Sequence, residues 1–313
     1  MIQSCQICGN EDNNSFHVAK EMHLGLRDEF NYLECVNCGC LQLINIPADF
    51  SKYYPQDYYS FKSPMQKTSW KKYRLSKRTA YWLNHPTFIG WLLCLGKKRP
   101  DRLIWSKKIH LRFSSRILDI GCGSGTLLSE MAEAGFTNLI GVDPYIQHDI
   151  AYKNSVKIFK SEIYDLNNKQ FDFIMLHHSF EHMQNPEQVL NKIYTLLAPK
   201  AHLLIRIPIA SSYAWRHYGI NWVQLDAPRH LFLHTVKSIE LLAHKSNLVI
   251  KDIIWDSTAS QFLGSESYKK GLSLVDSKMP DLTKEDLKSY RDMAAKLNLK
   301  HDGDQACFLF TKS

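Results

Sequence analysis

The sequence predicts an α/β protein with a doubly wound, mostly parallel sheet and a small cysteine-bearing module ahead of it. Three observations lead to this fold class. From residue 116 onward, short apolar runs alternate with segments of helical periodicity. The stretch ILDIGCGSGTLL at 117–128 places a glycine-rich turn between an apolar run and a helix. Before these elements, residues 1–46 hold five of the eight cysteines.

Residues 1–46 are predicted to form a zinc-binding module. Two C-x-x-C pairs, each followed by a glycine that lets the backbone turn around the thiolates, are formed by Cys5, Cys8, Cys35 and Cys38. Four soft ligands in two such turns predict a structural zinc ribbon with tetrahedral Zn²⁺. Four thiolates leave no open coordination position, so no catalysis is expected there. Cys40 is expected to be a free thiol rather than a ligand.

Residues 47–112 are predicted to form a tyrosine-rich linker and basic helices. Tyrosines and prolines gather at 47–63, and helical periodicity follows at 66–112, broken at His85-Pro86 and near Gly96. Two or three amphipathic helices are therefore expected, and they carry Trp70, Trp82, Trp91 and Trp105. Their apolar sides are expected to pack on the next domain; a role at a membrane surface is the less favoured alternative.

The charge is unevenly distributed along the chain. The net charge is +8, but the segment 62–116 contains fifteen Lys or Arg and one acid, Asp101, so it carries +14 and the rest of the chain −6. Such a field attracts anions: a nucleotide-linked substrate, nucleic acid or an acidic membrane surface. A solvated basic helix face is the alternative.

The composition is that of a globular protein, with 44% hydrophobic and 22% charged residues in a chain of 313. The most apolar window, FIGWLLCLG at 88–96, is too short to span a bilayer, and the first residues show no signal pattern. A cytoplasmic location with reduced or metal-bound cysteines is therefore expected.

Residues 113–313 are predicted to form the α/β domain. Seven apolar runs are strand candidates, at 116–120, 139–143, 156–159, 171–176, 202–207, 248–255 and 306–310. Helices fit at 125–135, 146–153, 187–197, 236–245 and 283–297. This alternation is typical of a doubly wound parallel sheet. Serines and glycines at 257–273 predict a mobile loop.

The glycine loop is predicted to bind a cofactor at the carboxyl ends of the strands. Its motif G-x-G-x-G, one residue tighter than a dinucleotide fingerprint, is formed by Gly121, Gly123 and Gly125. Asp119 just ahead of it would repel a pyrophosphate and favours a ligand with an ammonium group and no phosphate, such as S-adenosylmethionine. Asp143 ends the second strand, where a carboxylate can accept both ribose hydroxyls. Glu162 follows the third strand, where it can accept from the adenine amino group; capping a helix is its alternative.

Four segments between 116 and 208 together resemble the class I S-adenosylmethionine-dependent methyltransferases: ILDIGCGSGTLL, LIGVDP, FDFIMLHHSFEHMQNPEQVL and LAPKAHLLIRIP. The cysteine pairs, YYPQDYY and DAPRHLFLHT at 226–235 resemble the branch with an N-terminal zinc-binding module, often associated with sugar and surface-polysaccharide biosynthesis. The resemblance implies a seven-stranded sheet whose last strand, 306–310, is antiparallel. The expected cofactor-binding residues are Asp119, Gly121, Cys122, Gly123, Asp143, Pro144, Glu162, Ile163 and His177. The chain departs from the family pattern in having Glu162 for Asp, Ser161 for Gly, and the pair His177-His178 at the end of the fourth strand.

Methyl transfer from a sulfonium needs positioning and exclusion of water, and a hydroxyl acceptor also needs a base. His182 is predicted to be that base because related enzymes with the E-H-x-x-x-P pattern place a histidine beside the acceptor; His178 is the second candidate. Capping a helix or a hydrogen bond in the core is the alternative role of His182. Arg229 and His230 are candidate substrate-binding residues, and Arg229 pairs either with a substrate phosphate or with Asp226.

The function expected from these residues is O-methylation of a sugar, nucleotide-sugar or glycan intermediate, with the basic segment attracting a diphosphate; N- or C-methylation is a close variant. An RNA methyltransferase is one alternative, disfavoured because SFEHMQNP lacks the Asn/Asp-Pro-Pro-aromatic motif of amino-methylating nucleic-acid enzymes. A non-catalytic S-adenosylmethionine-binding scaffold is the other, and the intact Asp119, glycines and Asp143 argue against it.

Overall fold

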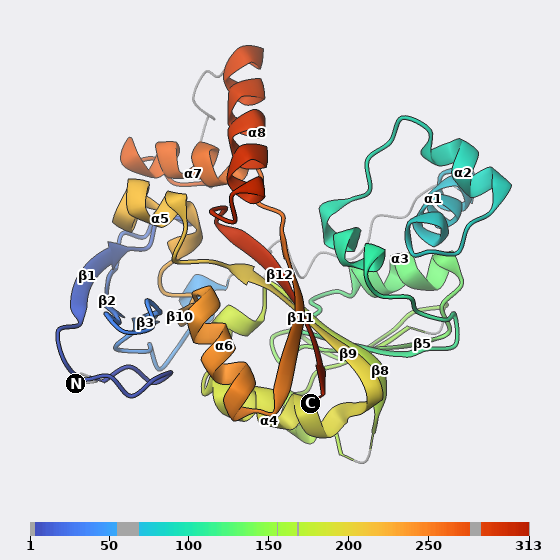
Figure 1. The fold of residues 1–313 in the computed structure, drawn as a ribbon, viewed down its shortest axis with the longest axis horizontal. Coiled ribbons are helices and arrows are strands. Elements are labelled where there is room, and N and C mark those ends of the chain that lie inside the picture. The colour runs from blue at the N-terminus through green and yellow to red at the C-terminus, as the bar shows by residue number, and fades with distance from the viewer. Residues whose placement is uncertain (1–3, 55–68, 155, 168, 276–282, 313) are drawn as a thin grey trace.

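A computed structural model describes residues 4–54, 69–154, 156–167, 169–275 and 283–312. Its centre is an eight-stranded sheet with the strand order β11-β12-β9-β8-β4-β5-β7-β6 (Figure 1). The strands are β4 (Arg116–Ile120), β5 (Asn138–Val142), β6 (Ile150–Ala151), β7 (Lys157–Phe159), β8 (Phe171–His177), β9 (Leu197–Pro208), β11 (Leu248–Trp255) and β12 (Gln305–Lys312).

The topology confirms the predicted doubly wound sheet. Strands β7, β5, β4, β8 and β9 are mutually parallel, and β12 lies antiparallel between β9 and β11. All seven predicted strands are present, and the last is antiparallel. The helix predicted at 146–153 is wrong: Ile150 and Ala151 instead form the edge strand β6, paired with Ile158 and Lys157. A short apolar run suits either state, and pairing with β7 decides it.

The central strands are apolar on both faces because each face is covered. Neighbouring residues of β4 enter different cores: Leu118 joins a core with helices α4 (Pro186–Leu196) and α6 (Val236–Lys245), and Ile117 joins one with α3 (Thr126–Ala134). Figure 1 shows α4 and α6 together below the sheet and α3 beside α1 at the other side. The helices predicted at 125–135, 187–197 and 236–245 are thus confirmed.

From residue 69 onward the structure shows two helices and a 3-10 segment: α1 (Ser69–Trp82), α2 (Phe88–Cys94) and η3 (Asp101–Lys107). The predicted tyrosine-rich segment lies outside the described residues from 55 onward. Trp82 and Trp105 are buried in the core shared with α3, as predicted, whereas Trp70 and Trp91 are exposed. The apolar side of this region is therefore only partly packed on the sheet domain.

The N-terminal residues form a second, four-stranded sheet with the order β1-β2-β3-β10. Its strands are β1 (Ser15–Lys20), β2 (Glu29–Glu34), β3 (Leu41–Leu43) and β10 (Phe232–Leu233). Because β10 comes from the segment that follows β9, the cysteine-bearing module shares backbone hydrogen bonds with the larger part of the chain.

The remaining helices are α5 (Tyr213–Tyr218), α7 (Ser260–Lys269) and α8 (Lys284–Leu299). Helix α8 confirms the helix predicted at 283–297. The mobile loop predicted at 257–273 is wrong, because α7 is a packed helix. A Cβ on Gly264 would lie 2.3 Å from Val223 Cγ2, and buried Ser265 Oγ accepts from Val223 N at 2.9 Å. The small residues permit close packing rather than motion. No helix in the described ranges has the length and apolarity needed to cross a membrane.

Candidate functional site

The four predicted metal-ligating cysteines come together at the end of the N-terminal sheet. The Sγ atoms of Cys5 and Cys38 lie 3.5 Å apart, as do those of Cys8 and Cys35, and all four atoms lie within 4.8 Å of one another. Tetrahedral thiolates at about 2.3 Å from Zn²⁺ are separated by about 3.8 Å, so the donor set fits this ion. Cys40 is buried nearby and is not among the four.

The cysteine module is bound directly to the loop that carries Arg229 and His230. Tyr32 Oη donates to His230 O at 2.8 Å, and Thr235 Oγ1 donates to Cys38 O at 2.6 Å. Glu21, from the turn between β1 and β2, is fully buried against the Arg229 guanidinium at 3.3 Å. The module therefore fixes the conformation of this loop.

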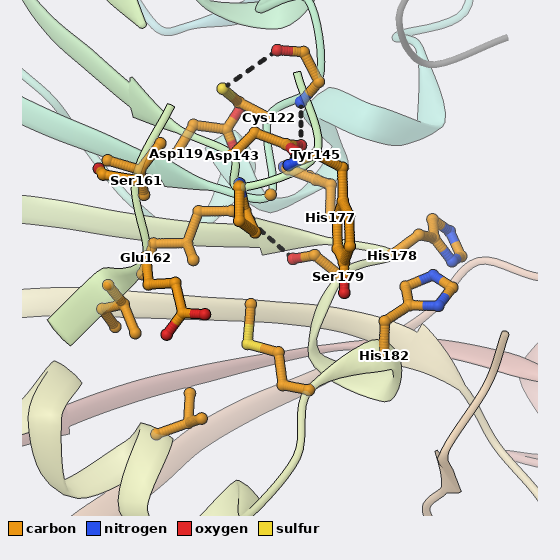
Figure 2. A pocket seen from close by; sticks show the side chains of 18 of the residues that line it. Asp119, Cys122, Asp143, Tyr145, Ser161, Glu162, His177, His178, Ser179 and His182 are labelled. Carbon is orange, nitrogen blue, oxygen red and sulfur yellow. Dashed lines mark hydrogen bonds between the residues drawn. The ribbon is translucent and has the colours of Figure 1, made fainter. Parts of the chain in front are cut away.

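A cavity of about 790 Å³ opens at the carboxyl ends of β4, β5, β7 and β8 (Figure 2), a size typical of ligand pockets. It is lined by all nine predicted cofactor residues: Asp119, Gly121, Cys122, Gly123, Asp143, Pro144, Glu162, Ile163 and His177. The glycine loop makes room for this cavity. Gly121 and Gly125 both have φ of +71°, and a Cβ would lie 2.4 Å from Ser179 Cβ and 2.2 Å from Ile158 Cδ1, respectively. No other residue fits these two positions without displacing a neighbour.

Two carboxylates face the glycine loop. Burial, reinforced by the nearby charge of Asp143, raises the pKa of Asp119 well above its ordinary value. A buried carboxylate has lost the water that stabilises its negative charge. A cationic group such as an ammonium replaces that stabilisation when it binds, so this position favours a cationic ligand. Burial also raises the pKa of Asp143, although its Oδ2 accepts from Gly123 N at 2.8 Å and its Oδ1 from Tyr145 N at 2.9 Å. Asp143 thereby joins the loop to the end of β5.

Glu162 lies at the far side of the pocket from the histidines in Figure 2. It is also the N-cap of the 3-10 turn Ile163–Asp165, where Glu162 and Asp165 each accept from the other's backbone N–H. The capping alternative is therefore realised. The residue still lines the cavity, and the cap holds its carboxylate in place.

His178 makes hydrogen bonds with both ring nitrogens. Arg206 Nη1 donates to His178 Nε2 at 2.8 Å, so this nitrogen is the acceptor, and Nδ1–H faces Glu181 Oε1 at 3.3 Å. Arg206 is in turn paired with Asp256 at 2.6 Å. Since Arg206 donates to the only lone pair of the neutral imidazole, that nitrogen is not available to an acceptor hydroxyl, and the ring instead orients Glu181.

His182 has a different environment at the other side of the same turn. Its Nδ1 lies 2.8 Å from Arg229 O, and since a carbonyl only accepts, Nδ1 carries the proton. The lone pair is then on Nε2, for which no hydrogen bond is found among the described residues. The Tyr54 ring meets the imidazole edge-on, its Oη lies 3.2 Å from the same Nδ1, and it stacks on Tyr145 with centroids 5.4 Å apart. His182 thus presents an acceptor nitrogen in the tautomer that a general base requires.

Arg229 and His230 lie deeper than the sequence predicts. The Arg229 side chain is fully buried, with Nε donating to Asp226 at 2.9 Å, which is the ion-pair alternative. His230 Nδ1 donates to Gln224 O at 2.8 Å, and burial together with neighbouring His182 lowers the pKa of His230 to about 4. Arg229 lines the cavity, and its carbonyl oxygen contacts His182 Nδ1. His230 is not among the lining residues and lies behind His182, with the two ring centroids 4.7 Å apart.

Glu181 is the buried charge beneath these histidines. Burial would raise its pKa, but the hydrogen bond from His178, together with the positive charge that His178, His182 and His230 carry when protonated, lowers the pKa to about 2. Glu181, His182 and His230 each offer one ligand atom within 4.8 Å of the others, an arrangement that could also hold a cation. The single lone pair on His182 Nε2 can bind either a metal ion or a proton. His182 therefore cannot use this atom as a metal ligand and as a base at the same time.

Sequence reasoning missed Glu21, Tyr54 and Arg206. Arg206 had a local signal, since it interrupts the apolar strand HLLIRI. Tyr54 lies in the motif YYPQDYY, which carries the resemblance but received no role at the site. Glu21 had no local signal, because it reaches the site only through the shared sheet.

Comparison with known proteins agrees with this geometry. A methyltransferase-domain family matches residues 95–252, half of the chain. The chain is 29% identical over 213 residues to a ubiquinone biosynthesis O-methyltransferase of Rickettsia canadensis, covering 62% of this chain and 90% of the relative. It is 35% identical over 82 residues to human EEF1A lysine methyltransferase 2, covering 26% and 34%. The cyclopropane synthase MmaA2 from Mycobacterium tuberculosis superposes with a TM-score of 0.44 at 14% identity, over 66% of this chain and 81% of that one.

The glycine cradle, the desolvated Asp119 and the loop-bound Asp143 fit S-adenosylmethionine, which carries an ammonium and a ribose but no phosphate. With the fold, the cavity and the family match in agreement, the chain belongs to the methyltransferase-domain family and is a class I S-adenosylmethionine-dependent methyltransferase.

Proposed function

We propose that the protein methylates a hydroxyl group of a sugar, nucleotide-sugar or glycan intermediate, with His182 as the general base. The observation that carries this proposal is the tautomer of His182. Its Nδ1–H is held by Arg229 O at 2.8 Å, so Nε2 keeps a lone pair at the edge of the cofactor cavity. A hydroxyl acceptor needs such a group, whereas an amine that is already neutral does not.

Asp119 would hold the ammonium of S-adenosylmethionine, and Asp143 the ribose hydroxyls. Glu162 would accept from the adenine amino group, with Ile163, Pro144 and His177 lining the same pocket. Cys122 and the loop glycines would lie beside the methionine moiety of the cofactor. The cofactor, when bound, supplies an activated methyl group. The chain's own contribution is to orient the acceptor oxygen, remove its proton at His182 Nε2 and keep water out.

The buried groups around His182 maintain this arrangement. Arg229, neutralised by Glu21 and Asp226, fixes the carbonyl that orients the imidazole. Anionic Glu181 lies under His182 and stabilises the imidazolium that forms when the proton is taken up. His178 holds Glu181 and is a positioning residue in this scheme.

The wall near His182 suits the ring face of a sugar. Tyr54 and Tyr145 form an aromatic stack beside it, and polar side chains of Gln184, Asn185 and Gln188 also line the cavity. Phenolic acceptors are the second candidate, because the same aromatic wall fits a flat ring. A similar chain, from Rickettsia canadensis, is named as an O-methyltransferase of ubiquinone biosynthesis, and this name supports the second candidate.

The test is a methyl-transfer assay against nucleotide-sugars, free glycans and catechols, with His182→Ala and His178→Ala in parallel. Loss of the base is expected to lower kcat about 10²–10⁴-fold, with unchanged S-adenosylmethionine binding by calorimetry and partial rescue by added imidazole. His178→Ala should lower kcat less, without rescue. If turnover survives both substitutions, the base assignment is wrong. EDTA can also remove a metal from the cysteine cluster, and Cys8→Ser controls for that. Activity that is lost in EDTA and restored by added divalent cations, with the Cys8→Ser variant itself remaining active, would favour the metal-ligand role of His182.

We also propose that Cys5, Cys8, Cys35 and Cys38 hold one structural Zn²⁺. Elemental analysis is expected to find one zinc per chain, and Co²⁺ substitution should give the thiolate charge-transfer absorption of a tetrahedral site. Cys8→Ser should lose the metal, whereas the matched control Cys40→Ser should retain it. Equal metal content in the two variants would contradict this assignment.

A further inference from the structure

The helix α2 presents an apolar face to solvent. Phe88, Trp91, Leu92 and Leu95 recur at the spacing of one helix face, and their exposed fractions are 76%, 46%, 52% and 53%. The opposite face, with Gly90 and Cys94, is buried. The helix has no polar side chain to turn toward water, so its exposed side is an apolar patch of the kind that marks an interaction surface.

The orientation of α2 is fixed by its packing on α1. A Cβ on Gly90 would lie 2.9 Å from Lys77 O and 3.0 Å from Tyr81 Cβ, so only glycine permits this approach. Thr87 caps the helix, its Oγ1 accepting from Gly90 N at 3.0 Å. The apolar face is therefore held outward by tight contacts on the other side. In Figure 1, α1 and α2 lie at one end of the molecule, away from the N-terminal sheet.

Basic side chains border this face. Residues 69–100 contain eight Lys or Arg and no Asp or Glu. Lys97 and Lys98, a few residues after the end of α2, are exposed, as are Lys71 and Arg74 on α1. Trp70, which is 67% exposed, stacks on Tyr73 with centroids 5.8 Å apart at the start of α1. Apolar and aromatic groups ringed by positive charge are complementary to a surface that is negative outside and apolar beneath.

We propose that α2 and the adjoining start of α1 dock the protein on an anionic lipid bilayer, with Phe88, Trp91, Leu92 and Leu95 entering the headgroup–acyl boundary. A soluble diphosphate would bind the lysines but would make no contact that requires four exposed apolar side chains. RNA would use the lysines and the aromatic rings but not Leu92 and Leu95. The proposal goes beyond the methyl-transfer chemistry and does not depend on the acceptor.

The experiment is vesicle flotation with the full chain. The protein is expected to float with phosphatidylcholine vesicles containing phosphatidylglycerol, and far less with phosphatidylcholine alone. Leu92→Ser should lower the partition coefficient about tenfold, because several methylene groups no longer enter the bilayer. Lys97→Gln should lower it about fivefold, since a basic residue near the surface contributes about that factor. The matched controls Leu299→Ser and Lys300→Gln, at the exposed end of α8, should bind like the parent chain.

Tryptophan emission gives an independent readout. Anionic vesicles should shift the emission to shorter wavelength, and Trp91→Phe should still bind while losing most of that shift. Every variant should have the circular dichroism spectrum and the S-adenosylmethionine affinity of the parent chain, which shows that the substitution has not disturbed folding. The proposal is overturned if flotation is absent, or equal in Leu92→Ser and its control. It is equally overturned if the patch instead mediates salt-sensitive binding of an RNA oligonucleotide, or a dimer that Leu92→Ser dissociates.

Discussion

Two buried histidines on the segment that joins the two sheets predict acid sensitivity of the fold. Burial lowers the pKa of His230 and of His234 from 6.5 to about 4 in the folded chain. In the unfolded chain each takes up a proton near pH 6.5, so falling pH favours unfolding. The stability that their neutral forms contribute is complete above pH 6.5 and is lost towards pH 4. Each residue accounts for about 3 kcal/mol over that window, and together they give a slope of about 2.4 kcal/mol per pH unit near pH 5.

His234→Phe isolates one of these two contributions. The imidazole stacks between Phe180 and Phe232, with centroids 5.2 and 5.9 Å away, and its Nε2 is buried with no hydrogen bond among the described residues. Its Nδ1 lies 3.2 Å from Ser238 Oγ, which also donates to a backbone carbonyl. A phenyl ring can therefore occupy this position with little loss.

The measurement is urea unfolding followed by circular dichroism at pH 7 and pH 5. Moving between these values should cost the parent chain about 4 kcal/mol from the two histidines, and His234→Phe about 2 kcal/mol. His244→Phe, on the exposed side of α6, is the matched control and should behave as the parent. An identical loss of free energy in the parent and in His234→Phe would refute the reasoning, because burial of the neutral imidazole would then not set the pH dependence.

Three further substitutions test the cofactor loop and the buried ion pairs. Asp119→Asn should weaken S-adenosylmethionine binding about tenfold or more in calorimetry, since a charge-assisted hydrogen bond contributes about 1.5–3 kcal/mol; unchanged affinity would contradict the ammonium assignment. Gly121→Ala forces a Cβ to within 2.4 Å of Ser179 Cβ at a φ of +71°, so it should lower the melting temperature and abolish binding; a thermal shift with and without cofactor checks both. Arg229→Met should destabilise the fold by about 3–5 kcal/mol in urea, and adding Glu21→Gln should restore part of the loss; no restoration would mean that the uncompensated carboxylate is not the cause.

The elements that the sequence predicted correctly are those in which local pattern and tertiary contacts agree. The strands of the central sheet are apolar runs bounded by turns, and the glycine loop has a motif whose spacing is set by backbone geometry. The pattern failed where a neighbour decides: β6 exists because β7 offers an edge, and α7 exists because Gly264 and Ser265 fit against Val223. Small residues have the same composition in a loop and in a close contact, so composition alone cannot separate the two.

The candidate site shows the same limit at the level of side chains. His182 and His178 look equivalent in HHSFEH, but Arg206 and Arg229 O give them opposite hydrogen-bonding roles. Those partners are 28 and 47 residues away in the chain, and no local signal ranks the two histidines. Pairing in the tertiary structure, rather than residue type, determines which nitrogen keeps a lone pair.

The cysteine module and His182, the proposed base, are connected by a chain of contacts. Tyr32 holds His230 O, Glu21 neutralises Arg229, and Arg229 O orients His182. The first two contacts come from the N-terminal sheet, which the pairing of β3 with β10 brings against the loop after β9. The proposed Zn²⁺ would offer no open coordination position, yet it would still influence turnover by rigidifying the sheet whose side chains hold the Arg229–His230 loop.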